Sequence, residues 1–205
     1  MGFPPQNPLA GASFLLSVCE DWQLPPDAGF EVAFAGRSNA GKSTALNALA
    51  GHKALARVSR TPGRTQCLNV FTLDHERRLV DLPGYGYAKV PLPLKEQWGR
   101  LLTDYLEERE CLSGIVLVMD CRHVFTELDR TLLDWAKSRA RRVLTLLTKV
   151  DKLGHGAAVT ALRQAEHELA GAPGMSVQLF SGLRGTGVAQ ARAWIAETLE
   201  MPQEK

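Results

Sequence analysis

The sequence has almost no excess of charge of either sign. It contains 24 lysines and arginines against 22 aspartates and glutamates, which leaves a formal charge of +2 over 205 residues. So small an excess provides no strong long-range attraction to nucleic acid or to a membrane surface. The five histidines show no spacing typical of metal ligands, so a histidine-based metal site is not predicted.

A long hydrophobic run is also missing. The mostly apolar segment over residues 9–18 is far too short to span a bilayer, and no basic residue precedes it. We therefore expect neither membrane insertion nor a signal peptide.

Cysteines are few and irregularly spaced. Cys19, Cys67, Cys111 and Cys121 form no Cys-x-x-Cys pair, and their spacing fits neither a zinc site nor a disulfide framework. This pattern predicts four reduced thiols in a cytosolic protein, so the expected location is cytoplasmic.

Short β-type runs alternate with helical patterns along the chain. The predicted strands cover residues 32–35, 67–73, 79–81, 115–120, 143–147 and 177–180. This alternation predicts an α/β fold, with helices on both faces of a mixed, mainly parallel six-stranded sheet. Residues 74–78 are too few for a crossover helix, so we expect one antiparallel strand pair at an edge.

The helix signals support a single domain. Helices are predicted from Lys42, after Pro93, from the capping box that opens at Thr126, and over residues 158–169 and 188–199. We expect one domain over residues 12–200, a flexible segment over residues 1–11 and a frayed tail over residues 201–205.

A Gly-rich loop directly follows the first predicted strand and precedes a helical pattern, as in a P-loop. Glycines at both ends let backbone N–H groups turn inward around a polyphosphate, and the helix points its positive end at the same anion. Lys42 would bind the β- and γ-phosphates, and Ser43 would bind Mg²⁺. The candidate contacts are Gly36, Arg37, Ser38, Asn39, Ala40, Gly41, Lys42, Ser43 and Thr44.

A second loop follows the predicted strand over residues 79–81. Asp81 ends this strand, so its carboxylate should emerge where open α/β sheets bind their ligands and could hold Mg²⁺ through water. Gly84 would let the backbone approach a γ-phosphate and move when that phosphate leaves. The candidate contacts are Asp81, Leu82, Pro83 and Gly84.

Two further loops are candidates for base recognition. A carboxylate at Asp151 can accept hydrogen bonds from the N1–H and N2–H₂ edge of guanine, which adenine does not offer, while the stem of Lys149 can cover the base. A backbone amide near Ser181 could meet the guanine carbonyl. The candidate contacts are Thr148, Lys149, Val150 and Asp151, with Phe180, Ser181 and Gly182.

The polar loop over residues 59–66 holds the candidate sensor of the γ-phosphate. A hydroxyl that reaches Mg²⁺ only when this phosphate is present would act as a ligand-dependent clamp. Position alone does not decide between Thr61 and Thr65. The candidate contacts are Gly63, Arg64, Thr65, Gln66 and Cys67.

Taken in order, GRSNAGKS, TPGRTQ, DLPGYGYA, TKVD and FSG closely resemble the motifs of the bacterial EngB (YihA/YsxC) family of GTP-binding proteins, within the TRAFAC class of P-loop GTPases. The segment from Asp120 to His123 is similar to the family's D-x-R-H. The resemblance spans residues 12–200, and the conjunction of motifs is specific. It implies GTP and GDP as ligands, with Mg²⁺ on Ser43 and Thr65, which favours Thr65 over Thr61.

The resemblance also implies a biological role. It implies GTP hydrolysis, with Lys42, Thr65 and Gly84 as the candidate catalytic residues. It implies binding to the large ribosomal subunit or its precursor, through rRNA and ribosomal proteins, during assembly. It further implies a need for the protein in normal septation and cell division. We expect a monomer.

Two departures from the general GTPase pattern affect base binding. Thr148 stands where the generic motif has Asn, and Gly182 replaces a small side chain after Ser181. Both predict guanine selectivity with modest affinity.

Tyr85 follows Gly84 where many GTPases place the glutamine that orients the attacking water, so we expect slow intrinsic hydrolysis. A partner, Arg60, Arg64 or a monovalent cation could supply the missing function. Asn39 resembles the P-loop asparagine that binds K⁺ in related GTPases, although asparagine is also a common turn residue.

Three alternatives stay open. The chain could be a small P-loop phosphotransferase, against which Asp151 argues, or a non-hydrolytic GTP-binding scaffold for septation. Arginines near the predicted loops could bind RNA phosphates or form an ordinary solvated surface. These arginines are Arg57, Arg60, Arg64, Arg77, Arg78, Arg122, Arg139, Arg141 and Arg142.

Overall fold

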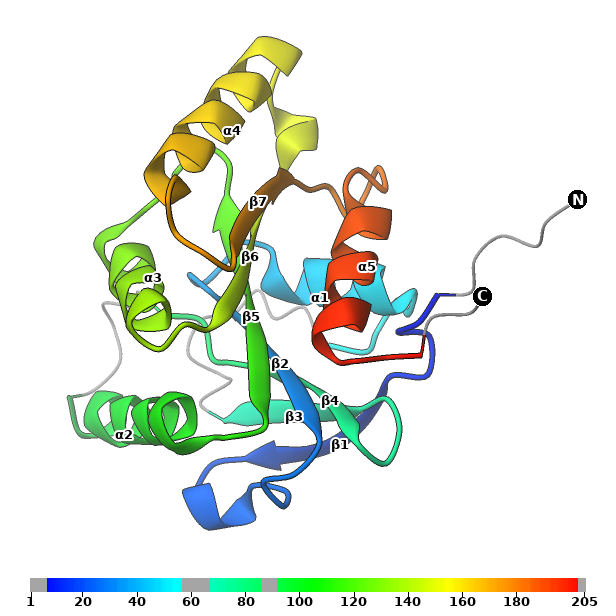
Figure 1. The fold of residues 1–205 in the computed structure, drawn as a ribbon, viewed down its shortest axis with the longest axis vertical. Helices are drawn as coiled ribbons and strands as arrows, with labels where there is room; N and C mark the ends of the chain where they lie inside the picture. The colour runs from blue at the N-terminus through cyan, green and yellow to red at the C-terminus, as the bar shows by residue number, and fades with distance from the viewer. Residues whose placement is uncertain (1–6, 57–66, 86–91, 203–205) are drawn as a thin grey trace, which may run out of the picture.

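A sheet of seven strands forms the centre of the fold over the residues that the computed structural model describes, which are 7–56, 67–85 and 92–202, without the side chains of 92–98. The strand order is β1-β3-β4-β2-β5-β6-β7 (Figure 1). The strands are β1 (Ser13–Val18), β2 (Phe30–Gly36), β3 (Leu68–Thr72), β4 (Arg77–Asp81), β5 (Leu112–Asp120), β6 (Arg142–Thr148) and β7 (Met175–Leu179).

The pairing confirms the predicted mixed, mainly parallel α/β sheet. Strand β3 runs antiparallel to its two neighbours β1 and β4, whereas β4, β2, β5, β6 and β7 pair in parallel. The predicted count of six strands is corrected to seven, because β1 adds an edge strand. Its consecutive residues Phe14 and Leu15 are 56% and 46% exposed, so β1 lacks the alternation of apolar and polar residues by which a strand is recognised.

In the described part of the chain, four α-helices lie between strands and a fifth, α5, follows β7. They are α1 (Lys42–Ala50), α2 (Leu92–Glu108), α3 (Glu127–Ser138), α4 (His155–Leu169) and α5 (Val188–Thr198), and two 3-10 turns lie at Asp21–Gln23 and Val150–Lys152. The predicted capping box at Thr126 is confirmed, with the Thr126 N–H donating to Asp129 at 2.8 Å. In this part of the chain, no helix combines the length and apolarity needed to cross a bilayer.

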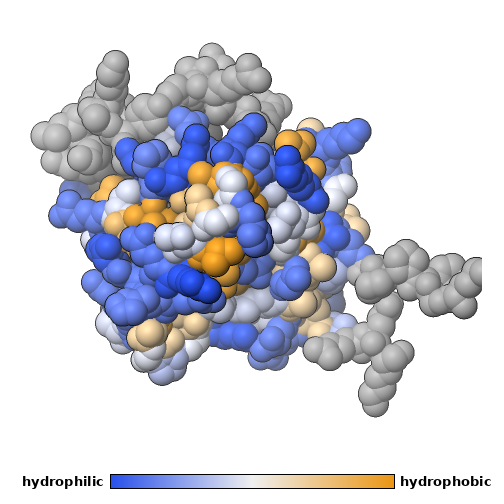
Figure 2. All heavy atoms as spheres, turned by 90° about the horizontal axis from the view of Figure 1, so that it is seen from above, coloured by the Kyte–Doolittle hydropathy of each residue, from blue (hydrophilic) through white to orange (hydrophobic). Residues whose placement is uncertain are grey.

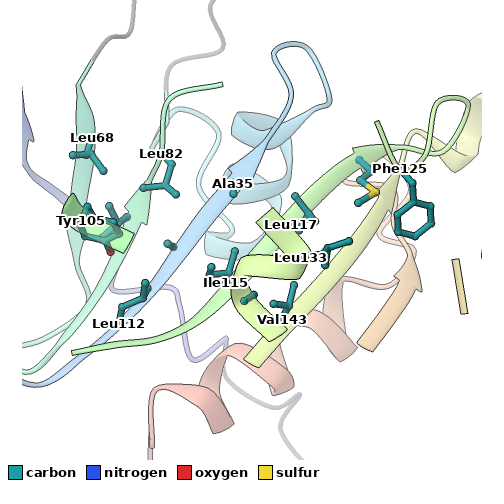
Figure 3. Packing of buried hydrophobic residues seen from close by; sticks show 14 of the residues in the cluster. Ala35, Leu68, Leu82, Tyr105, Leu112, Ile115, Leu117, Phe125, Leu133 and Val143 are labelled. Carbon is teal, nitrogen blue, oxygen red and sulfur yellow. The ribbon is translucent and has the colours of Figure 1, made fainter. Parts of the chain in front are cut away.

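The sheet separates two hydrophobic clusters. Because side chains alternate along a strand, Ala33 and Ala35 of β2 face one cluster, and Val32 and Phe34 face the other. The first cluster also holds buried residues of α2, α3 and α4, and Figure 3 shows Tyr105 on the side of Leu68 and Leu82 and Leu133 beside Leu117. The second cluster holds buried residues of α1 and α5. The sheet is therefore covered by helices on both faces, as predicted.

A disulfide joins Cys19 to Cys67, so the prediction of four reduced thiols is wrong for this pair. The two residues are 48 positions apart in sequence, but they flank the last pair of the β1–β3 ladder, Val18 and Leu68, with a Cα–Cα distance of 4.4 Å. Spacing along the chain cannot reveal a bond that strand pairing creates. Disulfides are uncommon in cytosolic proteins, so the cysteines no longer support the predicted compartment.

The other two cysteines are free and buried. Burial raises the pKa of the Cys111 thiol to about 12, so this thiol stays protonated at neutral pH.

Part of the N-terminal segment packs on the domain. The Asn7 side-chain amide donates to the carbonyl oxygens of Leu49 and Ala50, at 3.1 and 2.9 Å, near the end of α1. Leu9 is fully buried in the second cluster. The sequence did not indicate these contacts for residues within the segment that we expected to be flexible.

Candidate functional site

The P-loop sequence connects β2 to α1 at the carboxyl end of β2. Gly41 has a φ of 100°, which a residue with a side chain rarely adopts, and α1 begins at Lys42 as predicted. The free N–H groups of this helix start are the ones that the prediction assigns to phosphate. Figure 2 views the molecule from the side toward which β5 and β7 run in Figure 1, and hydrophilic side chains there surround a smaller apolar group.

The structure brings Lys42 and Asp81 together. Their ammonium and carboxylate groups form an ion pair, and their side chains are only 11% and 8% exposed. Asp81 is the last residue of β4, so the carboxylate leaves the sheet at the same edge as the P-loop. At this edge the Asp81 carboxylate already binds one cation, the Lys42 ammonium.

The donors present in the chain fit Mg²⁺. The Asp81 carboxylate and the Ser43 hydroxyl are hard oxygen donors, which Mg²⁺ prefers. Among the described residues no cluster of three or more His, Cys, Asp or Glu side chains could hold a metal ion. Mg²⁺ commonly takes one or two protein ligands and completes its shell with water and substrate phosphates.

Two residues of the TKVD segment hold the P-loop from the side of β6. The Thr148 hydroxyl lies within hydrogen-bonding distance of the carbonyl oxygens of Ala40 and Met119. The Lys149 ammonium donates to the Asn39 carbonyl oxygen at 2.7 Å. Thr148, which we considered as a replacement for asparagine, therefore ties β5, β6 and the P-loop together.

Asp151 and Ser181, which come from separate candidate loops, are in direct contact. The Ser181 hydroxyl donates to Asp151 Oδ1 at 2.7 Å. This hydrogen bond stabilises the charged form and lowers the pKa of Asp151 below its usual value. Asp151 is therefore an ionised acceptor at neutral pH, with one oxygen already oriented by Ser181.

Gly182 packs closely against α1. A Cβ atom at this position would lie 3.0 Å from the Ala48 Cβ atom and 3.2 Å from the Thr44 carbonyl oxygen. A side chain at residue 182 would therefore require α1 or the loop after β7 to shift by a few tenths of an ångström. The departure at Gly182 has a structural reason that sequence comparison of motifs did not reveal.

Asp120 is a site residue that we had noted only as part of a family motif. It ends β5, and it accepts hydrogen bonds from Arg122 at 2.9 and 2.6 Å and from the Lys149 ammonium at 2.9 Å. Burial alone would raise the pKa of Asp120, but these hydrogen bonds outweigh it and hold the pKa well below its usual value. A carboxylate directly after a buried strand was the signal for this role.

Tyr85 is held on both its backbone and its side chain. The Ser38 N–H donates to the Tyr85 carbonyl oxygen at 3.0 Å. The Tyr85 hydroxyl forms a short hydrogen bond with Asp129 of α3. The phenol is therefore engaged by the protein and does not take the place of the missing glutamine.

A cleft of about 370 Å³ lies between the P-loop, the end of β5 and the start of α3. It is lined by Arg37, Ser38, Asn39, Ala40, Met119, Asp120, Arg122, His123, Asp129 and Lys149. Asn39 has a φ of 64°, which agrees with its interpretation as a turn residue and leaves its K⁺ role a prediction.

Other candidates present only their backbone to this edge or lie elsewhere. Leu82 and Phe180 are buried in the two hydrophobic clusters, and Val150 packs against the first. Cys67 is bonded to Cys19. Gly63, Arg64, Thr65 and Gln66 lie outside the described residues, as do Arg57, Arg60 and Thr61.

Arg78 is not available to a partner. It is only 8% exposed and donates to buried Glu31 at 2.8 Å, so its predicted place among surface arginines for RNA is wrong. A buried strand residue paired with a distant carboxylate cannot be distinguished from a surface arginine by sequence position.

Comparison with known proteins agrees with this arrangement. A family model described as 50S ribosome-binding GTPase matches residues 31–149. The chain is 49% identical over 207 aligned positions to the probable GTP-binding protein EngB of Shewanella amazonensis, covering 94% of this chain and 95% of that protein.

Solved structures show the same fold. One is a crystal structure of a probable GTP-binding protein EngB, with a TM-score of 0.63 and 19% identity, covering 83% of this chain and 98% of that chain. Another is Era of Aquifex aeolicus bound to GDP.AlF4-, with a TM-score of 0.65 and 22% identity, covering 85% and 57%. From the sequence match and the family model, the chain belongs to the EngB family of GTP-binding proteins and is a GTPase.

Proposed function

We propose that the chain is a slowly hydrolysing guanine-nucleotide switch that assists assembly of the large ribosomal subunit. The observation that carries the nucleotide site is the convergence of four sequence-distant loops at one sheet edge. The P-loop contacts Asp81, Tyr85, Thr148 and Lys149, and Asp151 contacts Ser181. A single ligand of nucleotide size could bridge them.

In this proposal Lys42 binds the β- and γ-phosphates, and Ser43, Asp81 and Thr65 hold Mg²⁺, which would neutralise phosphate charge. The Lys42–Asp81 ion pair supports the assignment, since it already sets a cation and an anion side by side at this edge. Gly84 and Thr65 respond to the γ-phosphate, and with Lys42 they are the proposed catalytic residues. The remaining P-loop residues, Gly36 to Thr44, contact phosphate through their backbone.

Slow hydrolysis is proposed because Tyr85 stands where many GTPases place the glutamine that orients water, and the Tyr85 hydroxyl is already hydrogen-bonded to Asp129. No water-orienting glutamine stands at this position, so acceleration would come from a partner, Arg60, Arg64 or K⁺ bound near Asn39.

The ribosomal partner is proposed from the family, whose model is described as 50S ribosome-binding GTPase. A role in septation and cell division follows from the family resemblance, and the cytoplasmic location from the proposed ribosomal partner. Exposed arginines offer charge for RNA, although Arg122, Arg139 and Arg142 each pair with a carboxylate.

Guanine selectivity is tested by competition and by changing Asp151. GTP and GDP should displace a fluorescent guanine nucleotide, and ATP should not, because adenine lacks the donor pair that Asp151 accepts. Asp151→Asn should weaken GTP binding by roughly 10- to 150-fold, the effect of losing hydrogen bonds to a charged group, and should favour xanthosine nucleotides.

The matched control is Asp134→Asn, because the Asp134 side chain is 74% exposed in α3. It should leave nucleotide affinity unchanged. Equal competition by ATP, or an Asp151→Asn variant with wild-type selectivity, would contradict the proposal.

The ribosomal role is tested by sedimentation. The protein should move with large ribosomal subunits when the GTP analogue is present and remain at the top of the gradient with GDP. Binding should weaken at higher salt, because contacts to RNA phosphates release counterions. If the protein moves with the subunits regardless of nucleotide, or never moves with them, the proposed GTP-dependent binding to the ribosomal subunit is wrong.

A further inference from the structure

Tyr85 continues the contact between β2 and β4 beyond the ends of both strands. Arg37 and Tyr85 form a parallel β-bridge, and the Ser38 N–H donates to the Tyr85 carbonyl oxygen at 3.0 Å. The backbone that follows Gly84 is therefore hydrogen-bonded to the P-loop itself.

The side chain of Tyr85 connects the same segment to α3. Its hydroxyl is hydrogen-bonded to Asp129 Oδ1. Asp129 is only 2% exposed, and its other oxygen accepts from the Thr126 N–H at 2.8 Å and the Thr126 hydroxyl at 2.7 Å. The capping box of α3 thus fixes the acceptor that Tyr85 uses.

The phenol remains a donor at any ordinary pH. Burial, the charge of Asp129 and the hydrogen bond itself raise the pKa of Tyr85 above its usual value.

Because Tyr85 is hydrogen-bonded to both Ser38 and Asp129, the preceding residue, Gly84, lies against the P-loop. A Cβ atom on Gly84 would be 3.0 Å from the Ser38 Cα atom and 3.2 Å from the Ser38 nitrogen. This close approach depends on where Tyr85 is held, since Tyr85 is the next residue in the chain.

We propose that Tyr85 is a positioning residue for the γ-phosphate. Its hydrogen bond to Asp129 holds Gly84 beside Ser38 before GTP binds, so less ordering is needed when the Gly84 N–H meets the terminal phosphate. The inference rests on the proposed function, in which Gly84 contacts that phosphate. GDP has no such group and gains nothing from this arrangement.

The test compares affinities of Tyr85→Phe for a non-hydrolysable GTP analogue and for GDP by calorimetry. The variant keeps the ring and loses only the hydroxyl. We expect the analogue to bind about 3- to 10-fold more weakly, a part of the effect of a hydrogen bond to a charged group, and GDP to bind as in wild type. A residue that only stabilises the fold would shift both affinities together or neither.

Asp129→Ala provides an independent variant, because it removes the acceptor instead of the donor. It should reduce the ratio of analogue to GDP affinity as Tyr85→Phe does, and the double variant should reduce it no further. Thr131→Val is the matched control: the Thr131 hydroxyl is exposed on the same helix and donates to the Glu127 carbonyl oxygen at 3.0 Å, so its removal should leave the ratio unchanged.

A wild-type ratio of affinities in Tyr85→Phe and Asp129→Ala would overturn the inference while the guanine selectivity of wild type remained. A folded Lys42→Ala variant that binds the GTP analogue as tightly as wild type would overturn phosphate binding by the P-loop, and with it the proposed function and this inference together.

Discussion

We expect Lys42→Ala to abolish tight binding of GTP. Truncating one member of a buried charge contact typically costs about 2–5 kcal/mol, which is roughly 30- to 5,000-fold in affinity. Lys42 begins α1 and forms an ion pair with Asp81, where it is proposed to bind the phosphates. Titration with a fluorescent GTP analogue measures the loss.

Lys53→Ala is the matched control for this experiment. Lys53 is exposed and lies beyond the end of α1, so its removal should leave the affinity for the analogue unchanged. Thermal unfolding of both variants separates lost binding from lost structure, since Lys42→Ala also leaves Asp81 without its partner. Wild-type affinity in folded Lys42→Ala would mean that the loop does not bind phosphate.

Glu31→Gln should strongly destabilise the folded protein. Glu31 is 1% exposed at the opposite end of β2 from the P-loop, and it accepts from Arg78 at 2.8 Å, from Arg109 at 2.7 and 3.1 Å and from Tyr105 at 3.0 Å. Removing its charge takes away the carboxylate that two buried guanidinium groups share, with only Asp27 still 3.8 Å from Arg109, and this costs about 3–5 kcal/mol. Urea unfolding measures the difference in free energy.

Glu197→Gln is the matched control for Glu31→Gln. Glu197 is 61% exposed and pairs with Arg142 at 2.9 Å, an exposed pair that contributes about 1 kcal/mol or less. Equal costs for the two variants would show that the buried cluster does not stabilise the fold.

The cluster of Glu31, Arg78 and Arg109 also predicts that the free energy of unfolding depends on pH. Burial alone would raise the pKa of Glu31, but hydrogen bonds and charge from Arg109 and Arg78 lower it below the usual 4.5. The charged form therefore stabilises the folded protein fully above pH 4.5, and the stabilisation is lost as pH falls through the folded-state value. The gap in stability between wild type and Glu31→Gln should narrow in acid.

Local signals were sufficient for several elements. The start of α1 at Lys42 and the capping box at Thr126 were predicted correctly because a glycine turn and a Thr-x-x-Asp pattern act on neighbouring backbone groups. The antiparallel β3–β4 pair was predicted because five connecting residues permit little else.

Contacts between distant segments were not predictable in the same way. The Cys19–Cys67 disulfide exists because β1 pairs with β3, and β1 itself carries exposed apolar residues on consecutive positions. The Tyr85–Asp129 hydrogen bond joins residues 44 positions apart, one beyond the end of β4 and one in the first turn of α3. No periodicity along the chain records such pairs.

The amino-acid sequence alone was enough for the α/β class, the GTPase family and the residue types of the candidate site, because glycine turns, apolar alternation and motif spacing act over a few neighbouring residues. Three-dimensional packing was needed to show that Thr148 and Lys149 hold the P-loop, that Ser181 orients Asp151 and that Asp129 holds Tyr85. These relations depend on strand order and register, which bring together groups far apart in the chain.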